Sequence, residues 1–264
     1  MLYGDVAERP SIAGVCSGAD VVVHLASLNE HDSAADPRRA LLVNSYGTRN
    51  MLEEALCAGS PLFIYVSTFH VYGDHDGRIG EDAYPRPMAD YASTHLFSEF
   101  YGLQFARAKG LPVSIVRLSN GYAAPVAKEI DRWSLLVNDL CKAAHERGVL
   151  VLKTPGLHKR DFVWIPDLAQ AVTLLAAAPR DAVTRQVFNV AYGESRAIYD
   201  VALMVRDVYR GLYGKELPIE RPQPRSVEKY SAPEVSIDKL RALGYRPHDM
   251  LREEIRRTLL LLES

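Results

Sequence analysis

The chain has 264 residues, of which 48% are hydrophobic and 24% charged, and its formal net charge is -2. These values exclude a disordered or fibrous chain, and they provide enough apolar side chains for one large domain or two closely joined ones. The start MLYGDVAERP lacks a signal-peptide pattern, and the chain has neither a basic run nor a stretch of ~18 apolar residues, so we expect a cytoplasmic protein with no nucleic-acid partner and no membrane span.

Four short and almost continuously apolar runs alternate with longer helical patterns. The runs are Val21 to Leu25, Leu62 to Ser67, Val113 to Leu118 and Val187 to Val190. Continuous hydrophobicity over so few residues indicates strands that are buried on both faces. The repeated order of strand, helix and strand predicts an α/β fold with a doubly wound parallel sheet.

Two of the connecting helices have recognisable ends. The first has Asp36 as its cap and Pro37 at its first position, and it stops at Gly59. The second is predicted to open near Asp90 and to close at Gly110. Each helix joins two successive strands, which is the connection that parallel strands require.

The alternation loosens in the second half of the chain. A helix is predicted around Trp133 to Arg147, followed by a strand at Val149 to Leu152 and a basic turn at His158 to Arg160. Asp161 to Ile165 and a helix from Asp167 to Ala178 are then expected to return to the main sheet. Further helices are predicted at Tyr199 to Tyr213, Ile237 to Leu243 and Leu251 to Leu262.

This order predicts two interleaved parts. Residues 1–122 and 161–196 form the part with the parallel sheet, and residues 123–160 and 197–264 form a smaller α/β lobe on the substrate side. The ligand cleft is expected between them, at the carboxyl ends of the strands.

The three cysteines do not suggest a disulfide or a metal site. Cys16, Cys57 and Cys141 are odd in number, far apart and without His or Cys partners at ligand spacing. We interpret all three as small buried hydrophobic residues, and we expect no bound metal.

Polar residues follow the predicted strand at Leu62 to Ser67. The carboxyl end of a parallel strand is where the ligand crevice is expected. The hydroxyl of Thr68 at this point can orient a substrate hydroxyl. Tyr91 and His95 are four residues apart in the next predicted helix, so they share one face. A tyrosine whose pKa is ~10 is a poor base at neutral pH without a nearby positive charge. The spacing by itself is more typical of an ordinary helix face.

Eight segments in the same order resemble the extended short-chain dehydrogenase/reductase family, in its branch of NAD-dependent sugar-nucleotide epimerases and dehydratases. They are GDV at Gly4, VVVHLAS at Val21, NSYGTRNMLEEA at Asn44, VSTFHVYG at Val66, YASTHLFSE at Tyr91, RLSNGY at Arg117, RDFVWIPDLAQAV at Arg160 and FNVAYGES at Phe188. The resemblance covers nearly the whole chain, and it implies a Rossmann-like cofactor domain and an enzyme that uses NAD or NADP.

The resemblance also implies roles for individual residues. Thr68 would hydrogen-bond the reacting sugar oxygen, and Tyr91 would move the hydroxyl proton while hydride passes between the sugar and nicotinamide, with His95 beside it. The residues implied for the cofactor are Asp5, Val6, Leu25, Ala26, Ser27, Asn44, Ser67, Tyr91 and His95. Those implied for the nucleotide-sugar substrate, besides Thr68, are Asn120, Arg160 and Arg225, because an arginine suits a diphosphate.

Some of these residues also have purely structural interpretations. Asn120 is also compatible with capping a turn, and Arg160 with a surface ion pair to Asp161 or Asp167. Both interpretations remain open at the level of sequence.

The sequence departs from the family in two places. The family has a lysine four residues after the tyrosine, where this chain has His95, so we expect reduced, pH-shifted or absent activity. The family also begins with a strand, a glycine-rich phosphate loop and a helix, whereas this chain opens at GDV. The cofactor domain is therefore expected to lack its first strands and the loop that binds phosphate. A start codon assigned too far downstream, a truncated paralogue and an edge covered by a partner subunit all fit this pattern.

The leading hypothesis is an NAD(P)-dependent epimerase or related oxidoreductase acting on a nucleotide-activated sugar. The 4,6-dehydratases place an acidic pair just after the threonine, where this chain has Phe69 and His70, so elimination chemistry is disfavoured. The alternative is a catalytically impaired or inactive paralogue that binds a nucleotide sugar or a partner protein. A homodimer through the helices of Asn44 and Phe100 is the quaternary structure that the resemblance suggests.

Overall fold

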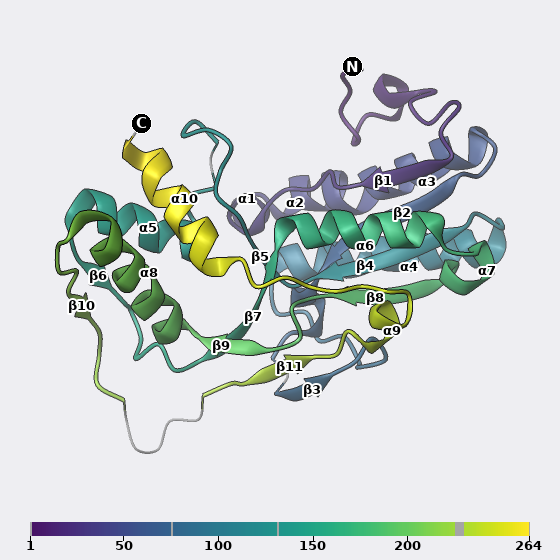
Figure 1. Cartoon of the computed structure of the whole chain (residues 1–264). Coiled ribbons are helices and arrows are strands. Elements are labelled where there is room, and N and C mark those ends of the chain that lie inside the picture. The colour runs from purple at the N-terminus through teal and green to yellow at the C-terminus, as the bar shows by residue number, and fades with distance from the viewer. Residues whose placement is uncertain (1, 75, 131, 225–229, 264) are drawn as a thin grey trace.

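The structure is a computed structural model that describes residues 2–74, 76–130, 132–224 and 230–263. Arg225, one of the residues implied for the substrate, lies outside the described residues. The chain forms a parallel sheet with helices on both faces and, beside it, a second group of helices (Figure 1).

The main sheet has four parallel strands in the order β1-β2-β4-β8. They are β1 (Val21–His24), β2 (Leu62–Thr68), β4 (Val113–Leu118) and β8 (Gln186–Val190). These bounds lie within one residue of the predicted runs, so the predicted α/β fold with a parallel sheet is confirmed. The last residue of β2, Thr68, pairs with Leu118 at the end of β4, so both strands end at the same edge.

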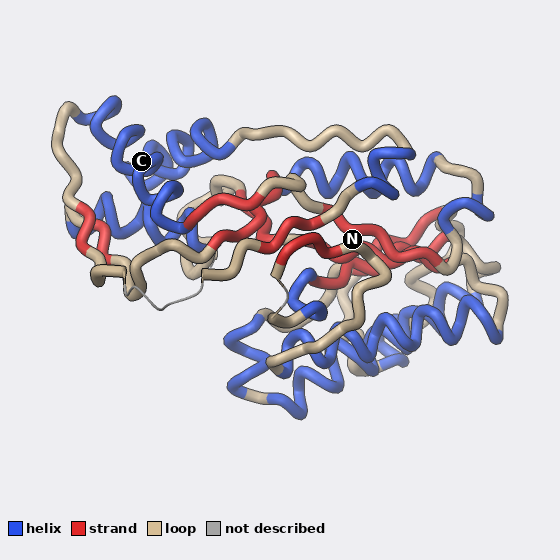
Figure 2. Tube along the Cα trace, turned by 90° about the horizontal axis from the view of Figure 1, so that it is seen from below, coloured by secondary structure: helices blue, strands red, loops and turns tan. Residues whose placement is uncertain are grey.

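Alternate residues of β2 face the two helical layers that cover the sheet (Figure 2). Phe63 and Tyr65 pack in a core with α3 (Gly47–Cys57) and α4 (Asp90–Ala108). Leu62 and Ile64 pack in a core with α6 (Ile165–Ala177) and α9 (Asp238–Ala242) on the opposite face. Because all seven residues of β2 are buried, its continuous hydrophobicity has a direct structural cause.

The predicted helix from Asp36 to Gly59 contains an irregular turn. The Asp36 carboxylate accepts a hydrogen bond from the Arg39 backbone N–H, and α2 (Pro37–Ala40) follows the cap as expected. A π-helical turn, Leu41–Tyr46, then leads into α3 without a break. A separate short helix, α1 (Glu30–Ala35), lies between β1 and this helix and is not predicted from the sequence.

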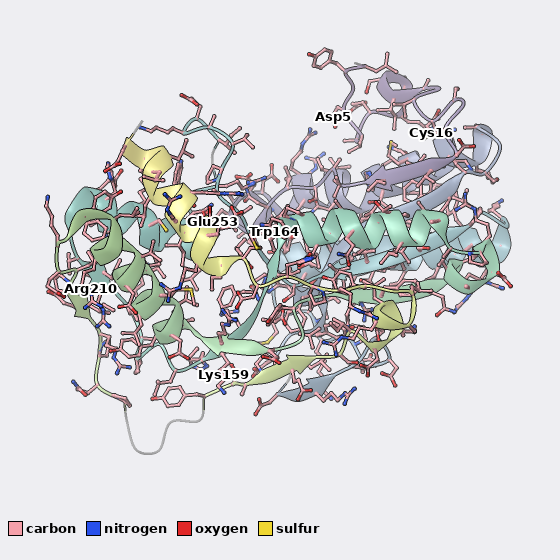
Figure 3. The ribbon with its side chains drawn as sticks, in the orientation of Figure 1. Asp5, Cys16, Lys159, Trp164, Arg210 and Glu253 are labelled. Carbon is pink, nitrogen blue, oxygen red and sulfur yellow. The ribbon has the colours of Figure 1, made fainter. Side chains whose placement is uncertain are left out.

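The second group of helices forms the smaller lobe. It contains α5 (Leu136–Arg147), α8 (Ile198–Tyr213) and α10 (Leu251–Glu263), with the short parallel pair β6 (Leu150–Val151) and β10 (Ile219–Glu220). Side chains from these elements share one hydrophobic core. Figure 3 places Arg210 on α8 and Glu253 on α10 in this lobe, with Trp164 between it and the main sheet.

The predicted basic turn at His158 to Arg160, and the return of Asp161 to Ile165 to the main sheet, are both wrong. Lys159–Trp164 is one strand, β7, which pairs in parallel with β5 (Asn120–Tyr122) and antiparallel with β9 (Ser195–Ala197). The buried Phe162 and Val163 favour a strand, and the ladder with β9 extends it back through the exposed charged residues. The remaining elements are β3 (Gly77–Ile79) paired with β11 (Pro233–Val235), α7 (Arg180–Val183), and the 3₁₀ turns at Arg9–Ile12 and Phe69–Tyr72.

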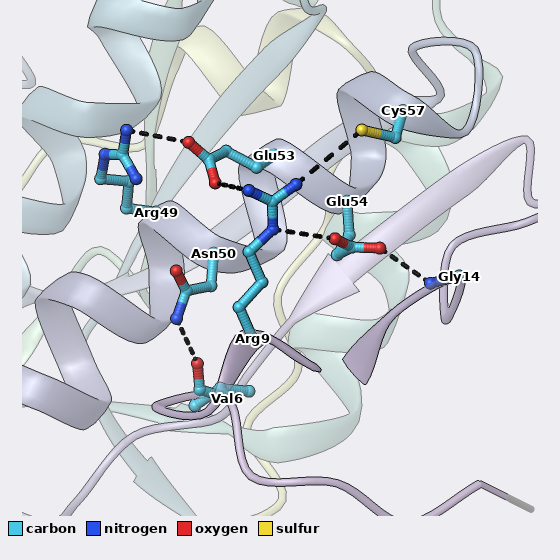
Figure 4. Close-up of polar contacts among 8 residues, drawn as sticks. All are labelled: Val6, Arg9, Gly14, Arg49, Asn50, Glu53, Glu54 and Cys57. Carbon is cyan, nitrogen blue, oxygen red and sulfur yellow. Dashed lines mark hydrogen bonds and ion pairs between the residues drawn. The ribbon is translucent and has the colours of Figure 1, made fainter. Parts of the chain in front are cut away.

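The first described residues are fastened to α3 by a cluster around Arg9 (Figure 4). The Arg9 guanidinium contacts the carboxylates of Glu53 at 2.5 Å and Glu54 at 3.1 Å. Glu54 also accepts a hydrogen bond from the Gly14 backbone N–H at 2.8 Å. Cys57 is exposed beside Arg9, so its predicted burial is wrong, because it lies at the last turn of α3 on the outer side. Cys16 and Cys141 are buried as predicted.

Candidate active site

A cavity lies where β2 and β4 end. Its lining includes Phe69 and His70, which directly follow β2, and Asn120, which follows β4. Tyr91, in the first turn of α4, lies on the same wall. The lobe side contributes Lys159 and Arg160 from β7, and Figure 3 shows Lys159 near β9 and β11. The cavity therefore brings together side chains from both parts of the chain.

Thr68 and Tyr91 are neighbours in the folded chain although 23 positions separate them in sequence. Thr68 is 4% exposed, and its hydroxyl accepts a hydrogen bond from the His70 backbone N–H at 3.2 Å. Burial raises the pKa of Tyr91 to about 12, with the charge of Glu30 adding to the rise and a hydrogen bond with Thr68 opposing it. Tyr91 is thus a protonated phenol at neutral pH, in contact with the threonine.

His95 is held inside the protein by Tyr65. The Tyr65 hydroxyl lies 2.6 Å from His95 Nδ1, and both side chains are 2% exposed. Burial raises the pKa of Tyr65, so its hydroxyl stays protonated and can donate to Nδ1, which leaves the ring proton on Nε2. Within the described part of the chain, His95 Nε2 is buried without a hydrogen-bond partner.

The position that the family fills with a lysine therefore carries no charge in this chain. Burial lowers the pKa of His95 to about 3, and the charges of His24 and His70 act in the same direction. The His95 ring packs edge-on against Tyr91, with 4.5 Å between the ring centres. A neutral imidazole at this distance gives the Tyr91 phenolate no electrostatic stabilisation. This arrangement agrees with the pKa of Tyr91, which lies above its ordinary value.

Asn44 connects the end of β1 to the helix of Tyr91. Its side-chain oxygen accepts from the Leu28 backbone N–H at 2.7 Å, and its amide donates to Thr94 at 2.9 Å. The Thr94 hydroxyl in turn donates to the Tyr91 carbonyl at 3.0 Å. Asn44 is 1% exposed, so it acts inside the protein and holds two walls of the site together.

The residues that directly follow β1 offer an open surface for a ligand. Leu25, Ala26 and Ser27 are all exposed at the carboxyl end of the strand. The Asp5 carboxylate binds Arg39 at 2.6 Å and accepts a hydrogen bond from the Ala7 backbone N–H at 2.9 Å. The hydrogen bond from Ala7, followed by the one from Arg39, lowers the pKa of Asp5.

These features fit the family's dinucleotide cofactor. An exposed stretch at the end of a parallel strand is the usual place for such a ligand. In addition, the buried His95 Nε2 beside Tyr91 has no hydrogen-bond partner among the described residues, so a bound ligand could supply one. The Val6 carbonyl accepts a hydrogen bond from the Asn50 amide, which fixes this segment on α3. The turn at Gly14 to Gly18 provides no substitute phosphate loop, since the Gly14 N–H is already bound to Glu54.

Ser67 points away from this cavity, into a buried ionic network. Its hydroxyl donates to Glu99 at 2.6 Å, and Glu99 forms a salt bridge with Arg117 in which Nε and Nη2 lie 3.0 and 2.7 Å from its two oxygens. The Arg117 guanidinium also lies 4.6 Å from the centre of the Tyr72 ring. Because the Ser67 hydroxyl is bound to Glu99, only the backbone of Ser67 is available to contact a cofactor.

Besides Thr68, the two other described substrate candidates, Asn120 and Arg160, line the cavity from the adjacent strands β5 and β7. The Asn120 amide donates to the Asp161 carbonyl at 2.9 Å, which ties β5 to β7. Asp161 accepts from the backbone N–H groups of Tyr192 and Gly193, and Asp167 pairs with His248. Neither carboxylate that the sequence offers as an alternative partner for Arg160 is therefore bound to it.

Three residues at the site have no predicted role in the sequence. Tyr65 holds His95, while Glu30 and His70 line the cavity beside Tyr91. Tyr65 is hard to single out because an aromatic residue inside a buried strand is ordinary. The position of His70, two residues after Thr68, is a signal that could have been used.

Two further searches of the described residues gave negative findings. None of their helices combines the length and apolar character needed to cross a membrane. Within the same part of the chain, no three His, Cys, Asp or Glu side chains gather closely enough to hold a metal ion.

Comparison with known protein families shows which family the chain belongs to. The model of the NAD dependent epimerase/dehydratase family matches residues 1–191. The chain belongs to this family. Its members are enzymes, and NAD is the cofactor in the family's description, so the predictions of family, enzyme class and cofactor are confirmed.

Individual family members are similar over much of the chain. A dTDP-glucose 4,6-dehydratase of Streptomyces antibioticus is 26% identical over 261 residues, which cover 97% of this chain and 74% of that protein. A dTDP-L-rhamnose 4-epimerase of Burkholderia thailandensis is 25% identical over 225 residues, covering 72% of this chain and 61% of that protein. The fold matches RMD from Pseudomonas aeruginosa, solved with NADPH, with a TM-score of 0.85 and 24% identity over 99% of this chain and 87% of that one.

Proposed function

We propose that this family member is an epimerase or related oxidoreductase that oxidises and reduces a hydroxyl-bearing ring carbon of a nucleotide-activated sugar. The observation that carries the proposal is the contact between Tyr91 and Thr68 in a cavity lined by residues of both parts of the chain. The similarity of the chain to a sugar-nucleotide dehydratase and a sugar-nucleotide epimerase supports the proposed substrate class.

Each part of the cleft has a separate task in this proposal. Residues 1–122 and 161–196 form the cofactor domain, in which Leu25, Ala26, Ser27 and the Nε2 of His95 hold NAD or NADP. Residues 123–160 and 197–264 form the substrate lobe, and Asn120 and Arg160 at the junction hold the nucleotide diphosphate. The nicotinamide, when bound, would supply the hydride acceptor and donor for the sugar carbon.

The protein's own residues control the proton in this reaction. Thr68 orients the sugar hydroxyl, and Tyr91 takes its proton on oxidation and returns it on reduction. With a pKa of about 12, only about one Tyr91 in 10⁵ is a phenolate at pH 7. We therefore expect the rate to rise with pH toward that value, since the base form becomes more abundant.

The function is tested by measuring cofactor and substrate together. Denatured protein is examined for released nicotinamide nucleotide, and native protein is titrated with NAD and NADP and with UDP-, GDP- and dTDP-glucose. Incubation of the bound pairs, followed by NMR of the sugar, is expected to show inversion at a ring carbon or a keto sugar. Tight sugar-nucleotide binding with no binding of either cofactor would contradict the enzyme and leave the non-catalytic alternative.

His95→Lys is expected to raise the rate at pH 7 on the order of 10- to 100-fold. A positive charge ~5 Å from Tyr91, at an effective dielectric constant of ~20, favours the phenolate by about two pKa units. The measurement is the pH profile of the rate, whose rise should move to lower pH. His95→Gln is the matched control, because it keeps a neutral polar side chain. An unchanged profile for the lysine variant would refute this charge argument.

We also propose that the protein forms a homodimer through the π-helical turn and α4, which are in contact. Leu41, Tyr46, Phe97 and Phe100 are between 45% and 57% exposed on these elements. A neighbouring copy would bury this apolar surface, and sedimentation velocity measures whether it does. A cytoplasmic location and the absence of a nucleic-acid partner stay predictions.

A further inference from the structure

The cavity at the ends of β2 and β4 is lined by charges of both signs, which come from different parts of the chain. Glu30, at the start of α1, and Asp74, which follows the 3₁₀ turn after β2, line it from the side of the main sheet. Lys159 and Arg160 of β7 line it from the side of the lobe. A ligand in this cavity therefore meets carboxylates as well as cations.

The Glu30 carboxylate has no charged partner at neutral pH. Its contact is with His70, whose Nε2 lies 3.7 Å from a carboxylate oxygen. Burial lowers the pKa of His70, Glu30 opposes this effect, and the charge of Arg160 adds to it, so the imidazole is neutral. Among the residues that the structure describes, no lysine or arginine forms an ion pair with Glu30.

Glu30 also acts on Tyr91, the proposed acid–base residue. Burial is the largest cause of the raised pKa of Tyr91, Glu30 adds to the rise, and a hydrogen bond with Thr68 and the charge of Arg132 oppose it. His95, at the position where the family has a lysine, is neutral. The Glu30 carboxylate therefore disfavours the phenolate that the reaction needs, unless a positive charge binds beside it.

A ligand is expected at this point on independent grounds. His95 is 2% exposed, its ring packs against Tyr91, and its Nε2 has no hydrogen-bond partner within the described part of the chain. Arg160 acts on His70, and His70 contacts Glu30, so the basic and acidic groups are close enough for one small molecule to reach both.

We propose that the sugar bound in this cavity carries a free amino group, whose ammonium form pairs with Glu30 while Arg160 binds the diphosphate. The ammonium gives the Glu30 carboxylate a charged partner. It also brings beside Tyr91 the positive charge that His95 does not carry, so the substrate itself favours the phenolate. A hydroxyl or an acetylated amine at the same ring position is neutral and provides neither effect.

This inference rests on the proposed function, because it specifies the sugar for the same cavity and the same proton transfer. It makes Glu30 a specificity-determining residue. It also explains how a tyrosine with a neutral histidine at the lysine position can act as a base, since the missing charge arrives with the substrate.

The proposal is tested by calorimetry and single-turnover oxidation on the full chain with two matched sets of nucleotide sugars. The first is UDP-glucosamine, UDP-glucose and UDP-N-acetylglucosamine. The second is dTDP-3-amino-3-deoxyglucose, dTDP-glucose and the N-acetylated form of the amino sugar. We expect the amino sugar of at least one set to bind on the order of 10-fold more tightly than its two neutral counterparts, and to be oxidised faster.

Substitutions at Glu30 separate its charge from a structural role. Glu30→Gln should abolish the preference, whereas Glu30→Asp, which keeps the carboxylate, should retain much of it. Because Glu30 raises the pKa of Tyr91, Glu30→Gln should also speed oxidation of the neutral sugar. Glu146→Gln is the matched control, since Glu146 is in an exposed pair with Lys142 on α5 and should leave the preference unchanged.

The two proposals fail in different ways. If neither amino sugar is preferred over its neutral counterparts, or if folded Glu30→Gln keeps the preference, the inference is overturned and the proposed function stands. If none of the nucleotide sugars binds, the proposed substrate class is overturned together with the inference.

Discussion

Tyr91→Phe is expected to reduce oxidation of the nucleotide sugar on the order of 100- to 10,000-fold while the protein still binds the sugar nucleotide. The phenylalanine keeps the ring that packs against His95 but removes the group that exchanges a proton with the sugar hydroxyl. Reduction of the cofactor, followed by its absorbance in a single turnover, measures this step directly.

Tyr101→Phe is the matched control for this variant. Tyr101 lies on the same helix, where its ring packs against Phe97 at 5.2 Å, away from the residues that line the cavity. Its loss should leave the rate unchanged. A Tyr91→Phe protein that reduces the cofactor as fast as the unsubstituted one would remove Tyr91 from the mechanism.

Glu99→Gln is expected to destabilise the protein by about 3–5 kcal/mol, because it leaves the Arg117 charge buried without its partner. Glu99 and Arg117 are 2% and 5% exposed, and the pair joins α4 to β4 directly beneath the end of β2. Urea unfolding gives the free energy of unfolding, and the midpoint should fall with an unchanged slope.

The control removes a carboxylate from an exposed pair. Glu253→Gln breaks the contact of Glu253 with Arg257 on α10, where both side chains are more than 40% exposed, and should cost less than about 1 kcal/mol. If both substitutions have the same small effect, the buried network does not hold α4 in place. A double variant with Glu99→Leu and Arg117→Met should recover much of the lost stability.

The sequence predicts the main sheet and its helices well because local signals and burial agree there. β2 is apolar throughout and completely buried, and the Asp36–Pro37 pair starts its helix as such a pair usually does. The strand β7 is mistaken for a turn because Lys159 and Arg160 are charged. Lys159 and Arg160 are in a strand because they pair with β9, which lies more than 30 residues later in the chain.

The sequence proposes the residues of the candidate site, but it does not predict their charges. A resemblance places Thr68 and Tyr91, and the structure brings them into contact. Whether His95 carries a charge depends on its burial and on Tyr65, 30 positions away, and no local pattern contains that information. The pairing of Glu30 with His70 likewise follows from the way α1 packs after β1.

The π-helical turn at Leu41–Tyr46 sets the rotational phase of everything that follows it. A π turn accommodates one more residue than an α turn, and each residue of an α-helix advances the chain by ~100° about the axis. Deleting one residue there would restore a regular helix and swing the side chains after it by that angle relative to Asp36. The three hydrogen bonds through which Asn44 and Thr94 connect Leu28 to the Tyr91 carbonyl would then lose their alignment. The length of this turn, counted in single residues, is therefore a geometric requirement of the candidate active site.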